Sequence, residues 1–413
     1  MSRYKIFHKE RILISNKSKL SIEFVKKIFH YRGLLRGKLT SIKDIIAGDF
    51  PNVEIIKLEK TRLYYSPPIY SNKFDKKSEM LEGKDYLQYS IRIYNAIVYG
   101  ESNAVALTSQ KLLYDMPVFD ESERYQYTDF NTKIYKIKKN NIYYWKGKTR
   151  TLEKAIWIGG SLSWNYYHLL YEFVIKFVKL NELDIPLDVP VLVDQVCFSI
   201  PQYKELLDIA NQKRYRLIEI ECKSRIKVGE LIYIAPPNFI PPNNKNINDV
   251  RPDDTQFNIR ALLDLRNCFL SHSSRNEFPK RIYISRKNAS HRRRFNENEI
   301  IQVLSEFGFT AVYPETLSIP DQVSLFNKAE WIIGGAGAAF TNLLFCSAGC
   351  KVVMFAKFKI SVSNFSTIAC AVNADLVSIT EEDTNKNVSS DLLHDSYELD
   401  PSYLREFLIN AGL

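Results

Sequence analysis

Short apolar segments separated by helix-length stretches mark the chain after Ala155. The segments AIWIGG, VPVLVD, RLIEI and LIYIAPP follow one another in this way as far as residue 237. Such alternation of strands and helices is typical of a parallel sheet with helices on both faces. The alternation restarts near residue 254, with strands expected in RIYISR, TAVYP, WIIGG and KVVMF. Helices are expected over residues 254–270, 297–307, 320–329 and 338–346. We therefore predict an α/β fold with two lobes and a cleft at the hinge between them.

The region before these lobes has other patterns. Residues 90–148 contain short alternating segments with turn residues, SIRIYNAIVYGESNAVALT and KIYKIKKNNIYYW, which predict hairpins. Residues 19–39, KLSIEFVKKIFHYRGLLRGKL, predict a basic amphipathic helix or a helix pair broken near Gly33. That helix either packs one face on the core or lies on an anionic membrane. Residues 235–254, rich in Pro and Asn, are the best linker candidate.

Composition narrows the class of protein. A chain of 413 residues with 45% hydrophobic residues suits two globular domains of about 150–200 residues each. The six cysteines include no C-x-x-C pair, which indicates reduced thiols in a cytosol and neither a disulfide framework nor a zinc site. Charge is scattered through the first ten residues, so no signal-peptide core is expected. The net charge of +10 favours anionic partners: a nucleotide, a phospholipid surface or nucleic acid.

The stretch WIIGGAGAAFTNLLF, residues 331–345, breaks an apolar run with glycines. Residues 331–350 carry no charge over the length of a membrane span, but their glycines and polar residues fit a doubly covered strand, loop and helix better. A dinucleotide fingerprint would need glycine where Phe340 stands, and a P-loop would need Gly-Lys-Ser/Thr. Two interpretations remain. The stretch is a structural tight turn, or it is an anion-binding helix start near Ala338 with Thr341 and Asn342 in the first turn.

A second candidate element is KRIYISRKNASHRRRFNENEI, which starts at Lys280. Arg286 directly follows the predicted strand, at the edge where open α/β sheets bind ligands, and guanidinium pairs well with phosphate oxygens. A basic cluster follows at Arg292, Arg293 and Arg294. Asn296 and Glu299 have the spacing of a helix N-cap with its capping-box acid. The alternative is a solvated basic loop.

A third candidate element is AIWIGGSLSWNYYHLLYEFVIKF. Asn165 is expected to cap a helix, with His168 in the first turn and Glu172 four residues later on the same face. A histidine beside a cleft with a carboxylate to orient it suits a general base near neutral pH. A structural histidine at a helix start is the alternative.

Together these elements resemble glycosyltransferase family 61 over roughly residues 90–356. The matching motifs are N-Y-Y-H with Glu four residues on, Y-I-S-R-K-x-A-x-x-R-x-x-x-N-E, P-E-x-L with Gln seven residues after the Glu, and I-I-G-x-x-G-A-x-x-T-N-L-L-F. They occupy residues 165–172, 283–297, 314–322 and 332–345. Two positions depart from the family pattern: Ala336 stands where many members carry His, and Leu169 where an aromatic residue is common.

The resemblance implies a GT-B-like fold of two Rossmann-like lobes and inverting transfer of a sugar from a nucleotide-sugar donor to a glycan or lipid-linked glycan acceptor. It implies no cofactor and no required metal, and the chain has no Asp-x-Asp motif. Bacterial relatives are tied to capsule or lipopolysaccharide assembly. We expect a cytoplasmic protein, with peripheral contact to the inner face of an anionic plasma membrane as an added possibility, and no nucleic-acid partner.

The resemblance also assigns roles along the chain. Residues 86–245 would form the acceptor-side lobe and 246–395 the donor-binding lobe, between an unassigned extension (1–85) and a C-terminal helix (396–413). His168 is the expected base, held by Glu172, with Glu172 itself as the fallback. Asn165 and Tyr167 belong to the acceptor side. The expected donor-binding residues are Arg286, Arg292, Glu315 at the nucleoside ribose, Gly335, Gly337, Ala338, Thr341 and Asn342.

Two rival interpretations stay open. A non-catalytic protein that binds nucleic acid or an anionic surface would use the Arg292–294 cluster and the basic residues of 19–38, and its binding would depend strongly on salt. A degenerate pair of lobes that binds nucleotide without catalysis is permitted by Ala336.

Overall fold

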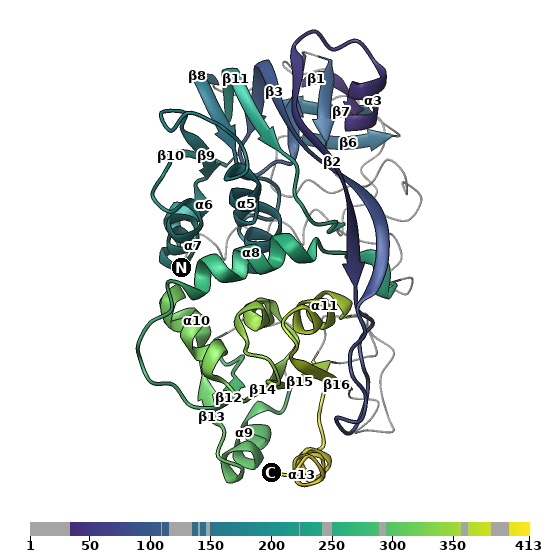
Figure 1. The fold of residues 1–413 in the computed structure, drawn as a ribbon, viewed down its shortest axis with the longest axis vertical. Helices are drawn as coiled ribbons and strands as arrows, with labels where there is room; N and C mark the ends of the chain where they lie inside the picture. The colour runs from purple at the N-terminus through teal and green to yellow at the C-terminus, as the bar shows by residue number, and fades with distance from the viewer. Residues whose placement is uncertain are drawn as a thin grey trace.

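The computed structural model describes residues 34–108, 110–114, 134–138, 141–145, 149–222, 224–241, 250–288, 295–356, 362–380 and 396–413. Within these ranges the chain forms two sheets, one above the other along the long axis of the molecule, with helices between them (Figure 1). The mixed α/β class predicted from the sequence is confirmed.

The first sheet has eleven strands and begins with a parallel part. Strands β10 (Leu217–Ile220), β9 (Val191–Asp194), β8 (Thr149–Trp157) and β11 (Arg225–Ile234) lie side by side in parallel. All four residues of β9 are buried, as expected for a strand covered on both faces. These are the strands that the apolar segments after Ala155 predicted.

The rest of the first sheet is mostly antiparallel. The long strand β3 (Leu81–Tyr99) pairs with β11, with β2 (Val53–Tyr65) and with β4 (Ala104–Ala106). The order continues through β5 (Lys111–Tyr114), β1 (Leu34–Thr40), β7 (Asn141–Trp145) and β6 (Ile134–Lys138). The hairpins predicted within residues 90–148 are confirmed as β3–β4 and β6–β7.

One prediction near the N-terminus is wrong at its C-terminal end. The basic helix expected over residues 19–39 cannot reach Leu39, because Leu34–Thr40 forms strand β1. This strand is bonded on both sides, to β5 and to β7, so the ladder satisfies its backbone as a helix would. Helix α3 (Ile42–Ala47) follows, with Ser41 as its capping residue. Residues 19–33 lie outside the described part of the chain.

The second sheet is entirely parallel and has the order β13, β12, β14, β15, β16. These strands are Thr310–Val312, Arg281–Ile284, Trp331–Gly335, Lys351–Ala356 and Asp375–Thr380. The first four were predicted. The connecting helices are α9 (Glu297–Glu306), α10 (Ile319–Lys328), the 3-10 helix η6 (Ala338–Phe345) and α11 (Ser363–Ala371), and α13 (Pro401–Asn410) ends the chain.

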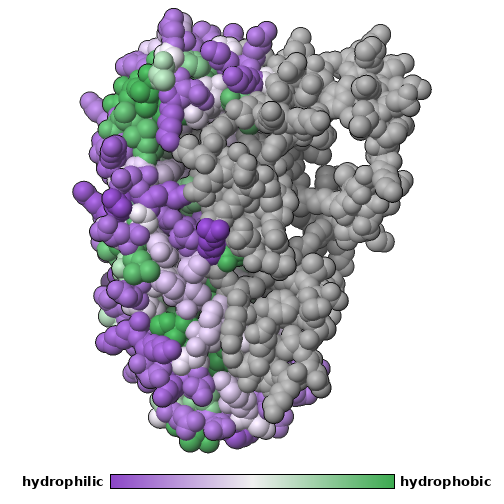
Figure 2. Space-filling view, turned by 90° about the vertical axis from the view of Figure 1, so that its right-hand side faces the viewer, coloured by the Kyte–Doolittle hydropathy of each residue, from purple (hydrophilic) through white to green (hydrophobic). Residues whose placement is uncertain are grey.

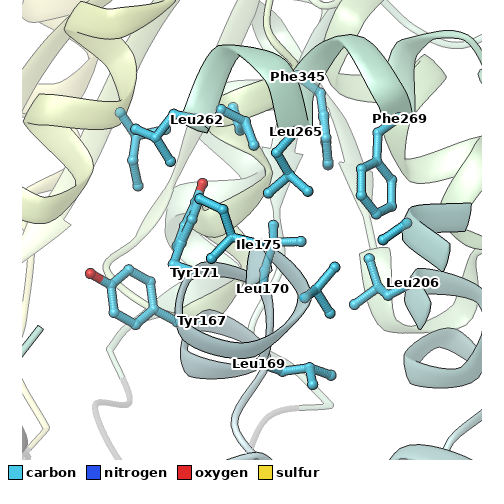
Figure 3. Close-up of a cluster of buried hydrophobic side chains, with 14 of the residues drawn as sticks. Tyr167, Leu169, Leu170, Tyr171, Ile175, Leu206, Leu262, Leu265, Phe269 and Phe345 are labelled. Carbon is cyan, nitrogen blue, oxygen red and sulfur yellow. The ribbon is translucent and has the colours of Figure 1, made fainter. Parts of the chain in front are cut away.

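A shared hydrophobic core joins the helices between the two sheets. From the first half come α4 (Tyr166–His168), the π-helix η2 (Leu169–Val174), α5 (Lys176–Leu180), α6 (Val196–Ser199) and α7 (Pro201–Asn211), and α8 (Ile259–Leu270) crosses the middle (Figure 1). Figure 3 shows Leu170 and Leu206 on one side of this core and Leu265, Phe269 and Phe345 on the other. Because all five are buried in one cluster, the two sheets share a core on the faces covered by these helices, while the opposite face of each sheet has a separate buried cluster.

Residues 66–78, between β2 and β3, lie against the second sheet. The Ser66 backbone N–H donates to Thr367 Oγ1 (2.8 Å), and Tyr70 forms a parallel bridge with Ser378 of β16. The Phe74 ring packs edge-on against Trp331, with ring centroids 5.6 Å apart. Part of the predicted N-terminal extension therefore contacts both sheets, while the domain boundaries at residues 85, 245 and 395 stay predictions.

The described surface and thiols fit a globular chain. Over the coloured part of the face in Figure 2, hydrophobic residues form separate spots among hydrophilic ones, which is ordinary for a folded protein. All six cysteines are free thiols, as predicted. No helix among the described residues is long and apolar enough to cross a membrane, and residues 331–350 divide into β14, η6 and the turn after it.

Candidate active site

The histidine and carboxylate predicted as a pair are in contact. Asn165 caps α4 as predicted, with its side-chain oxygen accepting the backbone N–H of Tyr167 (3.0 Å). His168 Nδ1 then lies against Glu172 Oε1. The Glu172 side chain is 5% exposed and the His168 side chain 16%, so the carboxylate is enclosed while the imidazole keeps an accessible edge. With Nδ1 facing the carboxylate, Nε2 is the nitrogen left for a substrate.

The helix that carries this pair departs from the predicted α geometry. Residues Leu169–Val174 form a π-helix, in which Ile175 N–H bonds back to Leu170 C=O, and all six residues are buried. Short π segments inside helices are frequent at functional sites.

A buried carboxylate organises the loop that leads from β8 to this helix. Asp194, at the end of β9, accepts the backbone N–H groups of Glu101 (2.6 Å) and Gly160 (2.8 Å). Burial raises the pKa of Asp194 to about 7, and the hydrogen bonds from Glu101, Gly160 and Ser163 offset part of that rise. Sequence analysis missed Asp194, although an acid closing the apolar segment VPVLVD beside the Gly159-Gly160 strand end was a usable signal.

The glycines of residues 335–337, hereafter the glycine turn, lie against Arg286. Arg286 Nη1 donates to the Ala336 carbonyl (3.3 Å). A Cβ on Gly337 would lie 2.3 Å from Arg286 Nη1, and a Cβ on Gly335 would lie 2.9 Å from Arg286 Cδ. The backbone of Gly337 is extended, a conformation open to any residue, so space for the arginine is the reason for glycine there. Arg286 thus lies where it was predicted, at the carboxyl edge of the parallel sheet.

Glu297 holds the strand end that presents Arg286. Its Oε1 accepts the Arg286 backbone N–H (2.7 Å), the Ser285 hydroxyl (2.7 Å) and the Tyr283 hydroxyl (3.0 Å). Three donors therefore converge on one carboxylate oxygen. Burial, with Glu297 beside it, raises the pKa of Tyr283, which therefore stays a donor.

The predicted capping box at Asn296 and Glu299 is not formed. Helix α9 does begin after Asn296, but the Asn296 side chain makes no cap hydrogen bond. Instead it exchanges two hydrogen bonds with the Leu399 backbone (2.9 and 3.0 Å) and donates to Glu299 Oε2 (2.7 Å). A paired contact with the C-terminal segment replaces the local cap, and a sequence motif of four residues does not reveal it.

Two predicted donor-binding residues of η6 contact the first half of the chain. Asn342 is fully buried, accepting the Tyr166 hydroxyl at Oδ1 (2.6 Å) and donating from Nδ2 to Gln322 (2.9 Å). The Thr341 carbonyl accepts the Tyr171 hydroxyl (2.7 Å), and the buried Thr341 hydroxyl has no partner among the described residues. Sequence analysis missed Tyr166 and Tyr171 as the other side of these contacts.

The remaining predicted residues lie in several different elements. Tyr167 packs its ring edge-on against His168 and Phe365, linking α4 to α11. Ala338 is exposed at the start of η6, and no side chain caps that helix within the described chain. Glu315 is exposed in a 3-10 turn after the edge strand β13. Arg292 lies outside the described residues.

Two further observations concern the surroundings. A cavity of about 260 Å³ between α5, α7 and α8 is lined by Phe177, Asn181, Arg260, Cys268 and their neighbours, and it contains none of the predicted site residues. No group of three or more metal-ligating side chains occurs in the described ranges.

The fold and the site define an α/β protein with an arginine at the carboxyl edge of a parallel sheet, the edge at which such proteins bind ligands. Residues 166–353 match the family model described as Glycosyltransferase 61. This part of the chain, which carries the His168–Glu172 pair, Arg286 and the glycine turn, is therefore similar to glycosyltransferase family 61. The resemblance expected from the motifs is therefore confirmed over this segment. No curated protein matched the chain.

Proposed function

We propose that the protein is an inverting glycosyltransferase that moves a sugar from a nucleotide-sugar donor to a hydroxyl group of a glycan acceptor. The observation that carries the proposal is the placement of Arg286 along the glycine turn, within the segment that matches the family. A guanidinium at the carboxyl edge of a parallel sheet is suited to the diphosphate of such a donor.

In this mechanism His168 Nε2 takes the proton of the acceptor hydroxyl. The acceptor oxygen bonds to the anomeric carbon as the bond from that carbon to the donor phosphate breaks, and the nucleoside diphosphate leaves. Glu172, in contact with Nδ1, stabilises the imidazolium that forms. If His168 serves only to orient the acceptor, Glu172 is the remaining base.

The leaving group gains negative charge as its bond to the sugar breaks. We assign its stabilisation to Arg286 and to the backbone amides at Gly337 and Ala338, where η6 begins without a side-chain cap within the described chain. Arg286 lies against the carbonyl of Ala336, so it supplies a cation beside the position where many family members carry His. Arg292 and, at the ribose, Glu315 complete the proposed donor contacts.

We extend the proposal to the architecture and setting of the enzyme. The half with the first sheet would be the acceptor side and the half with the second sheet the donor side of a GT-B-like pair of lobes, here joined by the shared core. Metal independence, a role in capsular or surface polysaccharide synthesis, and cytoplasmic work at the inner face of an anionic membrane belong to the same proposal.

Thermal unfolding against a panel of nucleoside diphosphates, with chelator present, tests the donor site. The variants are wild type, Arg286→Ala and Arg281→Ala. Arg281 is a matched control because it lies at the other end of β12, where its Nη1 donates to the Phe307 carbonyl. A ligand at a hundred times its Kd stabilises by about 2.7 kcal/mol, which raises the Tm by roughly a degree or more.

We expect one nucleotide to raise the Tm of wild type and Arg281→Ala but not of Arg286→Ala. If no nucleotide does so while mixed polyanions raise the Tm of all three, the protein is a basic-surface binder and the proposal is wrong. Binding of a nucleotide without transfer from any sugar donor would instead indicate the degenerate, inactive alternative.

A further inference from the structure

We propose that Tyr166 is a positioning residue that keeps the His168–Glu172 pair in register with the glycine turn, acting through Asn342 and Gln322. The inference rests on the proposed function and deepens it. It assigns Asn342 to this hydrogen-bond chain in place of direct donor binding.

The chain of hydrogen bonds crosses from one half of the protein to the other. The Tyr166 hydroxyl donates to Asn342 Oδ1 (2.6 Å), Asn342 Nδ2 donates to Gln322 Oε1 (2.9 Å), and Gln322 Nε2 donates to the Leu317 carbonyl (3.2 Å). Asn342 and Gln322 are 0% and 4% exposed, so water does not substitute for these partners. A buried amide that loses its partner costs about 1–3 kcal/mol.

The direction of the chain is set by its last member. A backbone carbonyl only accepts, so Gln322 must turn its Nε2 to Leu317 and its Oε1 to Asn342. Asn342 must then turn its Nδ2 to Gln322, which leaves Oδ1 facing Tyr166. Tyr166 is consequently required as a donor. Burial, with Tyr203 beside it, raises the pKa of the Tyr166 hydroxyl and keeps it protonated.

The first two members of this hydrogen-bond chain lie beside the groups proposed for catalysis. Tyr166 and His168 belong to the same short helix α4, and Asn342 lies in η6, which follows the glycine turn directly. The Tyr166 ring is also stacked on Tyr203, with centroids 6.2 Å apart, so the hydroxyl has little freedom to move away. A contact of this kind sets how far the base lies from the leaving group. Misplacement by about 1 Å can lower a rate about 100-fold.

The experiment measures kcat and donor KM for wild type, Tyr166→Phe, Asn342→Leu and the double variant. Tyr215→Phe is the matched control, because that buried hydroxyl also donates to a backbone carbonyl, Ile185 (3.2 Å), within the first half. We expect Tyr166→Phe and Asn342→Leu each to lower kcat by roughly 10- to 100-fold, with little change in donor KM. The double variant should be no slower than the slower single variant, because both changes break one chain. Tyr215→Phe should keep the wild-type kcat.

Three results would overturn the inference. In one, Tyr166→Phe lowers the Tm but leaves kcat unchanged, as for a purely structural contact. In another, the two single effects multiply in the double variant. In the third, Tyr166→Phe mainly raises donor KM, which would place Tyr166 at the donor itself.

A second measurement tests the positioning role of Tyr166 even if the proposed transferase function is wrong. If wild type transfers no sugar from any donor, the positioning role is read from the NMR ring signals of ¹³C-labelled histidine, with His168 identified by a His168→Gln variant. The chain has six histidines, so these spectra stay simple. The signal of His168 should move in Tyr166→Phe and stay in place in Tyr215→Phe. An unchanged signal in Tyr166→Phe would contradict the inference.

Discussion

The two sheets present their candidate chemistry in different ways. In the second sheet all strands are parallel, so the ends of β12 and β14 meet at one edge and bring Arg286 to the glycine turn. In the first sheet antiparallel and parallel strands are mixed, and its candidate groups come from one helix after β8. The parallel topology places Arg286 at the glycine turn, whereas the segment that leads to the histidine is fixed by side chains of Asn165 and Asp194 that accept backbone N–H groups.

The groups proposed for donor binding and for proton transfer therefore have separate local supports in this chain. Arg286 is held by Glu297 and packed on glycines, with all these groups in the second half. His168 is held by Glu172 within the first half. Substitution of Arg286 or of His168 itself should therefore alter one step and spare the other.

The largest expected effect comes from the proposed base. His168→Gln should lower kcat by about 100- to 10,000-fold, because a positioned general base contributes about that much. The nucleotide-induced rise in Tm should remain, since Arg286 is untouched. His272→Gln is the control, as His272 is exposed at the end of α8 and bonds only to its own helix end and Ser271 among the described residues.

Loss of nucleotide binding in His168→Gln would show that donor binding also depends on the first half, which contradicts separate supports for the two steps. Glu172→Gln sharpens the assignment of the base. If Glu172→Gln is clearly slower than His168→Gln, the carboxylate is the base and the histidine only orients the acceptor.

A smaller effect is expected from the buried carboxylate of the first half. The pKa of Asp194 is about 7 in the folded chain, against about 3.9 when unfolded. Between about pH 4 and pH 7 the Asp194 carboxyl is therefore protonated in the folded state and ionised in the unfolded state. The contribution of this group to the free energy of unfolding is fully present below about pH 4. That contribution is lost as pH rises through 7, by at most about 4 kcal/mol. Urea denaturation at pH 5 and pH 8 measures the part of this loss that falls between those two pH values.

The Asp194→Asn variant isolates this contribution, because an amide does not titrate. Its free energy of unfolding should fall less than that of wild type between pH 5 and pH 8. The same decrease in both proteins would show that Asp194 is ionised throughout this range and that its three donors outweigh burial.

Local sequence patterns predicted much of the fold and the His168–Glu172 and Arg286–glycine contacts of the candidate site. Strands β14 and β15 are almost fully buried, so they read as apolar runs and were found, and Asn165 was recognised as a cap from its place before a helix. Helix α11, SNFSTIACA, was missed because its β-branched and aromatic residues are weak helix formers. Strand β16 after it was missed as well.

Contacts between residues that are distant in the sequence could not be predicted from the sequence. Tyr166 and Asn342 are 176 positions apart in the sequence. The Leu399 carbonyl, which accepts a hydrogen bond from the Asn296 side chain, is 103 positions from Asn296. A single sequence shows which residues have hydrogen-bonding groups, but it does not show which of them meet. The capping box was wrong for that reason, since a distant partner satisfied Asn296 better than its own helix did.

The smallest of the three effects concerns the glycine turn. Gly337→Ala adds a Cβ where Arg286 Nη1 now lies, so the guanidinium must move while the extended backbone stays unstrained. We expect weaker nucleotide binding, by roughly 10-fold for one displaced charged contact, with the Tm of the free protein nearly unchanged. Nucleotide titration of wild type, Gly337→Ala, Arg286→Ala and the double variant measures this. Because the alanine acts through the arginine, it should have no further effect on the Arg286→Ala background. An equal loss on both backgrounds would show that the turn contacts the nucleotide independently, and that backbone and guanidinium bind it as two separate groups.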